Sequence, residues 1–348
     1  MNIALFSAVR YDSVIGGRTR RLCDELSCRH HVHFIEMPSL RHPCFCGTAR
    51  ISDRITRYSI MPMPRLWQHF DSFWGKWWIR NTGGFLRRYL PEDTHAIVST
   101  PFWAPVLEQM KFASITYDCL DHISVQAPEP FSETATILEN TLLDRADNIV
   151  CVSSKLTALM GWKTGKKVHL ITNGFPSEYL QENITYPSHP TAGFCGAMYE
   201  WFDVQLIREA ALALPDVRFI LTGPVRRKSD LDILRRISNI EISPAVPFEQ
   251  VKKEILRYSV GLIPFKRDTI SFFCNPLKAY EYLALGRPVV STVPSEEDIP
   301  VSYTGNNVEF ISELDRLLHT PSIPAVDRNI FKEYTWGNIA SKFERILK

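Results

Sequence analysis

Short apolar runs alternate with amphipathic helical patterns along almost the whole chain. Apolar runs of roughly four to eight residues between turn-forming residues are typical of buried strands, and apolar residues at three- and four-residue spacing indicate helices. This alternation predicts an α/β protein built from βαβ units. In the first half, the predicted strands are 2–9, 31–37, 96–100, 113–118 and 148–154, with helices at 18–29 and 135–146.

The pattern restarts after a strand-to-turn segment at 167–175. Strands are predicted at 191–198, 217–224, 240–243 and 260–265, and helices at 204–214, 229–237, 249–258 and 335–347. Two successive Rossmann-like units imply two domains, 1–172 and 173–334, joined in the turn at Asn173 and Gly174. The last segment, 335–348, is expected to pack back on the first domain.

Composition narrows the class of protein. The chain has 348 residues and a formal net charge of +2, so no basic field indicates nucleic acid as a partner. Eight scattered cysteines fit a reducing compartment. The N-terminus lacks the pattern of a signal peptide, and no run reaches the ~20 apolar residues that span a bilayer. We expect a cytoplasmic protein, with peripheral contact to the inner face of the cell membrane left open.

The stretch NPLKAYEYLALGRPVVST at 275–292 places a lysine in the first turn of a helix. Asn275 is expected as the N-cap and Pro276 as the first helical residue, with Gly286 ending the helix before a strand. Lys278 is then the third helical residue, where the helix dipole disfavours a cation. Glu281 follows on nearly the same face, so the two side chains either form a surface ion pair or hold a phosphate and a ribose. Because open α/β sheets bind ligands at strand ends, the second interpretation is favoured.

Acidic residues follow another predicted strand, in the first domain. Asp118, Asp121 and His122 are candidates for acid–base chemistry, although either aspartate could instead cap a loop or helix. Gly16 and Gly17 follow the first strand and open a helix, which would let the backbone approach a ligand or simply form a tight turn.

Residues 65–91 concentrate aromatic and basic side chains more densely than any other part of the chain. Aromatic rings beside arginines suit a bilayer interface, while packing of the rings into the first domain is the alternative. The rings in question are Trp67, Phe70, Phe73, Trp74, Trp77 and Trp78, and the cations are Arg65, Lys76, Arg80, Arg87 and Arg88.

Three segments, 193–207, 221–224 and 275–292, resemble bacterial GT-B glycosyltransferases that build surface polysaccharides, including the xanthan glucuronosyltransferase. The resemblance covers nearly the whole chain and implies two Rossmann-like domains facing across a cleft. The second domain would bind a nucleotide-diphosphate sugar, expected to be UDP-linked, and the first a saccharide or lipid-linked acceptor. By this resemblance Lys278 contacts the diphosphate and Glu281 the ribose. The other expected donor-binding residues are Gly196, Gly223, Asn275, Pro276 and Leu277.

Departures from the family pattern bear on mechanism. Retaining members carry an acid eight residues before the ribose glutamate, where this chain has Phe273, so an inverting reaction is expected. Asp121 is then the predicted general base, with Asp118 as the alternative and His122 as an orienting group. The DLD at 230–232 lies in a helical pattern, and we expect neither a metal nor a cofactor beyond the donor. A nucleotide-sugar epimerase of the same fold and a nonenzymatic nucleotide-sugar-binding protein are the alternatives.

Overall fold

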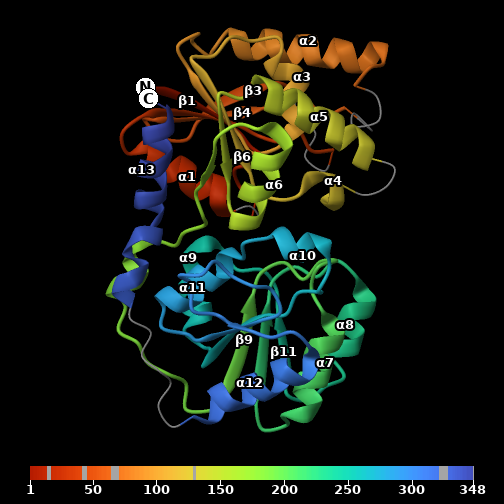
Figure 1. Cartoon of the computed structure of the whole chain (residues 1–348), viewed down its shortest axis with the longest axis vertical. Helices are drawn as coiled ribbons and strands as arrows, with labels where there is room; N and C mark the ends of the chain where they lie inside the picture. The colour runs from red at the N-terminus through yellow and green to blue at the C-terminus, as the bar shows by residue number, and fades with distance from the viewer. Residues whose placement is uncertain (14–16, 41–44, 64–69, 128–130, 321–327, 348) are drawn as a thin grey trace. The chain divides into compact units, whose positions relative to one another are not determined.

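The computed structural model describes residues 1–13, 17–40, 45–63, 70–127, 131–320 and 328–347. The chain forms two compact units. Unit 1 comprises residues 1–172 and 339–348, and unit 2 comprises residues 173–338. Each unit is built around its own sheet (Figure 1).

Unit 1 contains an eight-stranded sheet in the order β3-β4-β2-β1-β5-β6-β7-β8. All neighbouring strands are parallel except β3 and β4, which form an antiparallel pair that the sequence pattern did not predict. The predicted strands of this half are present. The bounds are β1 Asn2–Phe6, β2 His31–Ile35, β3 Gly47–Arg50, β4 Ile55–Ser59, β5 His95–Val98, β6 Ser114–Cys119, β7 Asn148–Cys151 and β8 Val168–Leu170.

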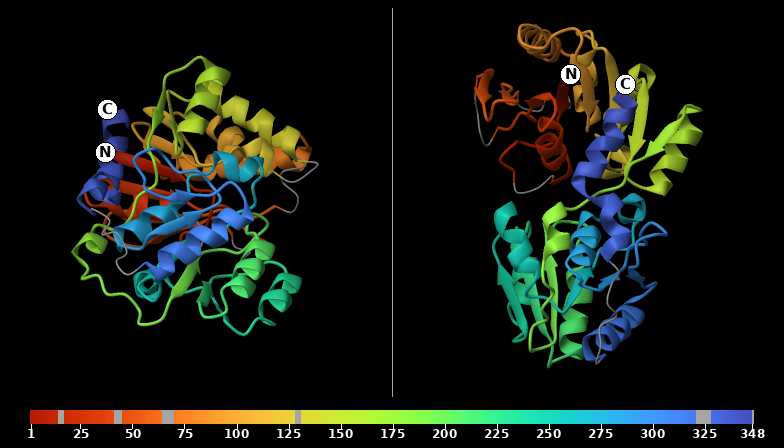
Figure 2. Two further views of the ribbon diagram at one scale, coloured as in Figure 1. Left: turned by 60° about the horizontal axis from the view of Figure 1, so that its bottom comes forward. Right: turned by 90° about the vertical axis from the view of Figure 1, so that its left-hand side faces the viewer.

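Helices connect the parallel strands of unit 1, as the crossover geometry of such strands requires. They are α1 Gly17–Ser27, α2 Phe73–Arg87, α3 Ala104–Leu107, α4 Ile123–Gln126, α5 Ser132–Arg145 and α6 Ser154–Thr164. The last helix, α13 (Trp336–Leu347), starts in unit 2 and continues into unit 1. There Glu344 pairs with Arg29 at 2.9 Å, so α13 lies beside the end of α1 (Figures 1 and 2).

Unit 2 contains a six-stranded parallel sheet in the order β11-β10-β9-β12-β13-β14. The strands are β9 Thr191–Cys195, β10 Arg218–Thr222, β11 Ile240–Ser243, β12 Val260–Ile263, β13 Val289–Ser291 and β14 Ser302–Tyr303. The helices are α7 Val204–Ala213, α8 Lys228–Leu234, α9 Phe248–Ile255, α10 Thr269–Phe273, α11 Leu277–Ala284 and α12 Asn307–His319.

Alternate residues along each strand of unit 2 supply two separate cores. Phe194 and Leu221 point toward α7, α8 and α12, while Cys195 and Ile220 point toward α9 and α11. A sheet buried on both faces explains why its strands read as continuous apolar runs rather than as alternating ones.

Both sheets have a position where the strand order reverses. In unit 1 it lies between β1 and β5, and in unit 2 it lies between β9 and β12. Open α/β sheets bind ligands outside the carboxyl ends of the strands at such positions. The fold therefore directs attention to the loops that follow β9 and β12, and to α11.

The aromatic and basic segment forms α2, capped by the Ser72 side chain, which accepts the Gly75 N–H at 3.0 Å. Some of its aromatic rings are exposed, as a membrane-contacting surface requires, and others are packed into unit 1. Phe73, Trp74 and Trp77 are exposed, with exposed fractions of 75%, 65% and 42%, whereas Phe70 and Trp78 are buried. Trp78 donates its indole N–H to the Met61 carbonyl at 2.7 Å. Phe70 and Trp78 were therefore wrongly grouped with an interfacial surface, because packing satisfies them; Trp67 and Arg65 lie outside the described residues.

Candidate active site

The start of α11 differs from the sequence prediction. The N-cap is Pro276, not Asn275, so the helix begins at Leu277 and Lys278 is its second residue. Asn275 instead donates its side-chain amide to the Tyr280 hydroxyl at 2.9 Å, and its carbonyl accepts the Asn173 amide at 2.6 Å. The Asn275 side chain is therefore directed toward Tyr280 rather than toward the free N–H groups of α11. Pro276, with a ψ of 111°, is extended. The predicted stop is confirmed, since Gly286 has a positive φ of 69°.

Lys278 and Glu281 form an ion pair in which the Nζ–Oε2 distance is 2.6 Å. The side chain of Glu281 is 4% exposed and that of Lys278 is 21% exposed, so this is not a surface pair. A carboxylate removed from water needs such a partner, because an unpaired buried charge is strongly disfavoured. The structure therefore contains a desolvated charge pair in the first turns of α11.

Tyr282, the residue after Glu281, fastens α11 to the sheet. Its hydroxyl accepts the Cys195 N–H at 2.9 Å, at the carboxyl end of β9. Its ring occupies space left by Gly261 of β12, where an added Cβ would lie 2.3 Å from the ring. Gly193, the register partner of Gly261 on β9, leaves space for the Tyr258 ring in the same way. Gly261 thus sets how closely α11 approaches the sheet at the reversal point, and Gly193 does the same for the segment that carries Tyr258.

Gly196 and Gly223 follow β9 and β10 and lie against each other. The Gly196 N–H donates to the Thr222 carbonyl at 2.9 Å, and a Cβ on Gly223 would lie 1.9 Å from the Gly196 carbonyl oxygen. Gly223 also has a φ of 147°, so a side chain is excluded there on two grounds. Backbone alone forms this edge of the sheet.

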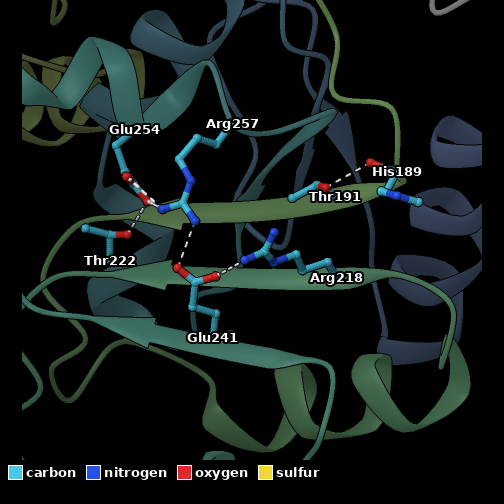
Figure 3. A network of polar contacts seen from close by, with 7 residues as sticks. All are labelled: His189, Thr191, Arg218, Thr222, Glu241, Glu254 and Arg257. Atoms are coloured by element: carbon cyan, nitrogen blue, oxygen red, sulfur yellow. Dashed lines mark hydrogen bonds and ion pairs between the residues drawn. The ribbon is translucent and has the colours of Figure 1, made fainter.

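A chain of polar contacts runs along β10 beneath that edge (Figure 3). The Thr222 hydroxyl donates to Glu254 at 2.6 Å, Arg257 donates to Glu254 and Glu241, and Arg218 pairs with Glu241. Hydrogen bonds from Arg257 lower the pKa of the Glu241 carboxyl, so the carboxylate stays charged. The network ties β10 and β11 to α9 and keeps the loop after Thr222 in place.

Cys195 ends β9 between these features, and its thiol is inert. Burial raises its pKa to about 11, so the nucleophilic thiolate is scarce at neutral pH.

In unit 1 the two candidate aspartates, Asp118 and Asp121, have different surroundings. Asp118, at the end of β6, is 1% exposed and accepts two hydrogen bonds from Arg18 of α1, at 2.9 and 3.0 Å. The same guanidinium donates to the carbonyls of Ile171 and Thr172 at 2.9 and 2.6 Å. Such a carboxylate holds the end of unit 1 together and has no room for a substrate. The buried pair with Arg18 argues against Asp118 as the general base.

Asp121 and His122 lie in the loop after β6 and are partly exposed. The Asp121 carbonyl accepts the Cys119 thiol at 3.6 Å, and His122 Nδ1 lies 3.0 Å from the Ser124 hydroxyl. The Ser124 contact holds the His122 ring within the loop that also carries Asp121. Gly17 is the first residue of α1, and Gly16 lies outside the described residues.

Arg18, Tyr282 and Glu254 contribute to this architecture and were not identified from the sequence. Arg18 pairs with an acid 100 positions away, a separation that no local pattern reveals. The segment 230–232 lies within α8, as its helical pattern predicted. Among the described residues, no group of three or more His, Cys, Asp or Glu side chains could hold a metal ion. The described helices include none that is long and apolar enough to cross a membrane.

The sequence and the fold of this chain were compared with those of known proteins. No family model matches the chain. The chain is 28% identical over 284 residues to TuaH of Bacillus subtilis (strain 168), a protein named as a glycosyltransferase of teichuronic acid biosynthesis. The matched region covers 70% of this chain and 68% of TuaH.

Solved structures share the fold across its full length. Sucrose-phosphate synthase from Thermosynechococcus elongatus has a TM-score of 0.71 at 17% identity, covering 99% of this chain and 98% of that chain. A UDP-forming trehalose-phosphate synthase from Burkholderia xenovorans has a TM-score of 0.72 at 11% identity, covering 99% of both chains. HepE from Anabaena, solved with UDP and glucose, has a TM-score of 0.69 at 14% identity and covers 99% and 98%. The chain therefore has the fold of GT-B glycosyltransferases, and its sequence is similar to that of a protein named as a glycosyltransferase.

Proposed function

We propose that this chain transfers a sugar from a UDP-sugar to a saccharide or lipid-linked saccharide acceptor, without a metal and with inversion at the anomeric carbon. Unit 2 would bind the donor and unit 1 the acceptor. The observation that carries the proposal is the desolvated Lys278–Glu281 pair in the first turns of α11. A surface ion pair would not need to be buried in this way.

The donor is assigned from the chemistry of that helix start. Lys278 and the positive end of the helix dipole attract a diphosphate. Glu281, one turn further along, can accept hydrogen bonds from the ribose hydroxyls. Gly196 and Gly223, which carry no side chains, form the neighbouring edge of the sheet. Donor binding would replace the Lys278–Glu281 contact with one contact from each residue to the nucleotide.

Asp121 is the proposed general base. An inverting transfer needs the acceptor hydroxyl to lose its proton as it attacks the anomeric carbon, while Lys278 stabilises the leaving diphosphate. Asp121 follows β6 in unit 1, is partly exposed, and has His122 beside it as an orienting group. Since Lys278 supplies the countercharge, no metal is required.

Peripheral membrane contact is proposed for the exposed face of α2, which would suit a lipid-linked acceptor. Phe73, Trp74 and Trp77 expose large amphipathic surfaces there. Lys76 and Arg80 on the same helix are also exposed, and can meet lipid phosphates.

Titration of UDP into the protein tests the donor assignment. Lys278→Ala and Glu281→Ala should each weaken UDP binding at least about tenfold, because a charge-assisted contact is worth roughly 1.5–3 kcal/mol. Lys252→Ala is the matched control, since Lys252 forms a 2.8 Å pair with Glu182 elsewhere in unit 2. Wild-type UDP affinity in both α11 variants would refute the assignment.

Asp121→Asn tests the chemistry separately. It should bind UDP normally yet transfer sugar ~10²–10⁴-fold more slowly, as loss of general-base assistance predicts. Asp118→Asn is its control and should retain turnover per folded molecule. Transfer to an acceptor, rather than an epimerised nucleotide-sugar or no reaction, separates the proposal from its two alternatives. A product that retains the donor's anomeric configuration would overturn the single-displacement scheme.

A further inference from the structure

Unit 1 contains a cavity of about 470 Å³ under the exposed face of α2. Residues of α2 and α5 form its walls, and Pro105, Glu108 and Gln109 of the α3 segment form the third side. It takes no part in the donor chemistry assigned above, because every lining residue belongs to unit 1.

Four charged residues line this cavity, two of each sign. Lys76 and Arg80 lie one turn apart on α2, and Asp71 and Glu108 complete the set. All four are exposed, and none forms an ion pair within the part of the chain that the structure describes. Two cations one helical turn apart can share a phosphate, and two carboxylates can accept from an ammonium group. A ligand that carries both a phosphate and an amine would complement these four charges.

Apolar residues also line the cavity. Ile79 of α2 faces Ile137 and Leu138 of α5, and Ile137 is 58% exposed. The exposed rings Phe73 and Trp77 project from the same helix as the two cations. A bilayer that receives these rings would bring its headgroups to the level of the cavity.

We propose that this cavity binds the headgroup of a zwitterionic aminophospholipid, and the proposal rests on the membrane contact included in the proposed function. The phosphate lies between Lys76 and Arg80, and the primary ammonium donates to Asp71 and Glu108. Phosphatidylethanolamine has this pattern. Phosphatidylcholine keeps the phosphate, but its three N-methyl groups remove every N–H donor, so its ammonium cannot hydrogen-bond to the carboxylates.

Binding to vesicles of equal size tests the headgroup assignment, with phosphatidylcholine alone, with added phosphatidylethanolamine, and with added phosphatidylglycerol. The wild type should bind the phosphatidylethanolamine vesicles about tenfold more tightly than phosphatidylcholine vesicles. Glu108→Gln should bring that ratio close to one, because it removes the contact that only a primary ammonium makes. Lys76→Ala/Arg80→Ala removes the phosphate contact that both lipids make, so it should weaken binding to both kinds of vesicle. Lys111→Ala, an exposed cation that does not line the cavity, should leave the ratio unchanged.

Trp77→Ala separates the headgroup site from membrane contact in general. It should weaken binding to both vesicles while the ratio is preserved. A wild-type ratio of one, or a ratio that survives Glu108→Gln, would overturn the headgroup site while membrane binding stands. Preference for phosphatidylglycerol would assign the cavity to anionic lipid instead. Wild type that binds none of the vesicles would refute the membrane contact itself.

Discussion

Gly261→Ala should weaken donor binding although Gly261 carries no side chain that could touch the donor. The added methyl carbon would lie 2.3 Å from Cδ2 and 2.6 Å from Cγ of Tyr282. Non-bonded carbons prefer about 3.5–4.0 Å, so the ring must retreat by roughly 1 Å or more. Tyr282 is part of α11 and is fully buried, so its retreat moves the helix that carries Lys278 and Glu281.

Two magnitudes follow from this displacement. Overpacking of a close-packed core costs about 1–3 kcal/mol of folding stability, which urea denaturation measures. A misplacement near 1 Å can cost up to about 10²-fold in a well-oriented site. We therefore expect UDP affinity, measured by calorimetry on folded protein, to fall between about tenfold and a hundredfold.

Gly193→Ala is the matched control. Its methyl carbon would lie 2.1 Å from the Tyr258 ring, so the overpacking is at least as severe. Tyr258 lies outside α11, and the stability loss should be similar while the loss of UDP affinity is smaller. The reasoning fails if Gly261→Ala binds UDP like the wild type despite its lower stability, or if both variants lose affinity equally.

Two further predictions concern unit 1. Asp118→Asn should lower the free energy of unfolding by about 3 kcal/mol, because it leaves the buried Arg18 guanidinium without a countercharge; a loss below 1 kcal/mol in urea denaturation would contradict the structural role of the pair. His33 should make stability pH-dependent, because burial lowers its pKa from 6.5 to about 4. Between these two pH values the unfolded state binds more protons than the folded state. Stability that is present above pH 6.5 is therefore lost as the pH falls toward 4, by at most about 1.4 kcal/mol per pH unit. His33→Gln should flatten that slope, and an unchanged slope would assign the effect to other groups.

The buried strands were predictable because a parallel sheet covered on both faces leaves continuous apolar runs in the sequence. The runs at β9 and β10 are examples, and both are buried nearly throughout. The β3–β4 pair was missed for the opposite reason. Its strands at the sheet edge are short and polar, with half of the β3 residues exposed, so no apolar run marks them.

Helix α12 shows a second kind of omission. Its apolar residues Phe310, Leu314 and Leu317 follow helical spacing and are buried against β12 and β13. The pattern was therefore available in the sequence, and the prediction overlooked it. The α11 start was misplaced because Asn275 and Pro276 are both common at helix starts, and only the tertiary bond from Asn275 to Tyr280 decides between the two registers.

In the candidate site, too, some features follow from local sequence spacing and others depend on contacts between distant segments. Spacing alone places Lys278 and Glu281 one turn apart on one face. Their burial depends on the approach of α11 to the sheet, which Gly261 and Tyr282 set through contacts between distant segments. The same holds for Asp118, because the sequence does not distinguish it from Asp121 and only the tertiary pair with Arg18 does.

The order of the charges in α11 argues that the pair was not selected for helix stability. A cation near a helix N-terminus is disfavoured by roughly 0.3–1 kcal/mol, and an acid preceding a base is the more stable order on a helix. In α11 both preferences are reversed, since Lys278 precedes Glu281 at the helix start. The carboxylate is also held away from water, which adds a desolvation penalty. Local rules broken together at one position are expected where a ligand supplies the compensating interaction. A diphosphate beside Lys278 and ribose hydroxyls at Glu281 would offset all three costs, which is why the donor site is assigned to this helix rather than to any of the better-capped helices of unit 2.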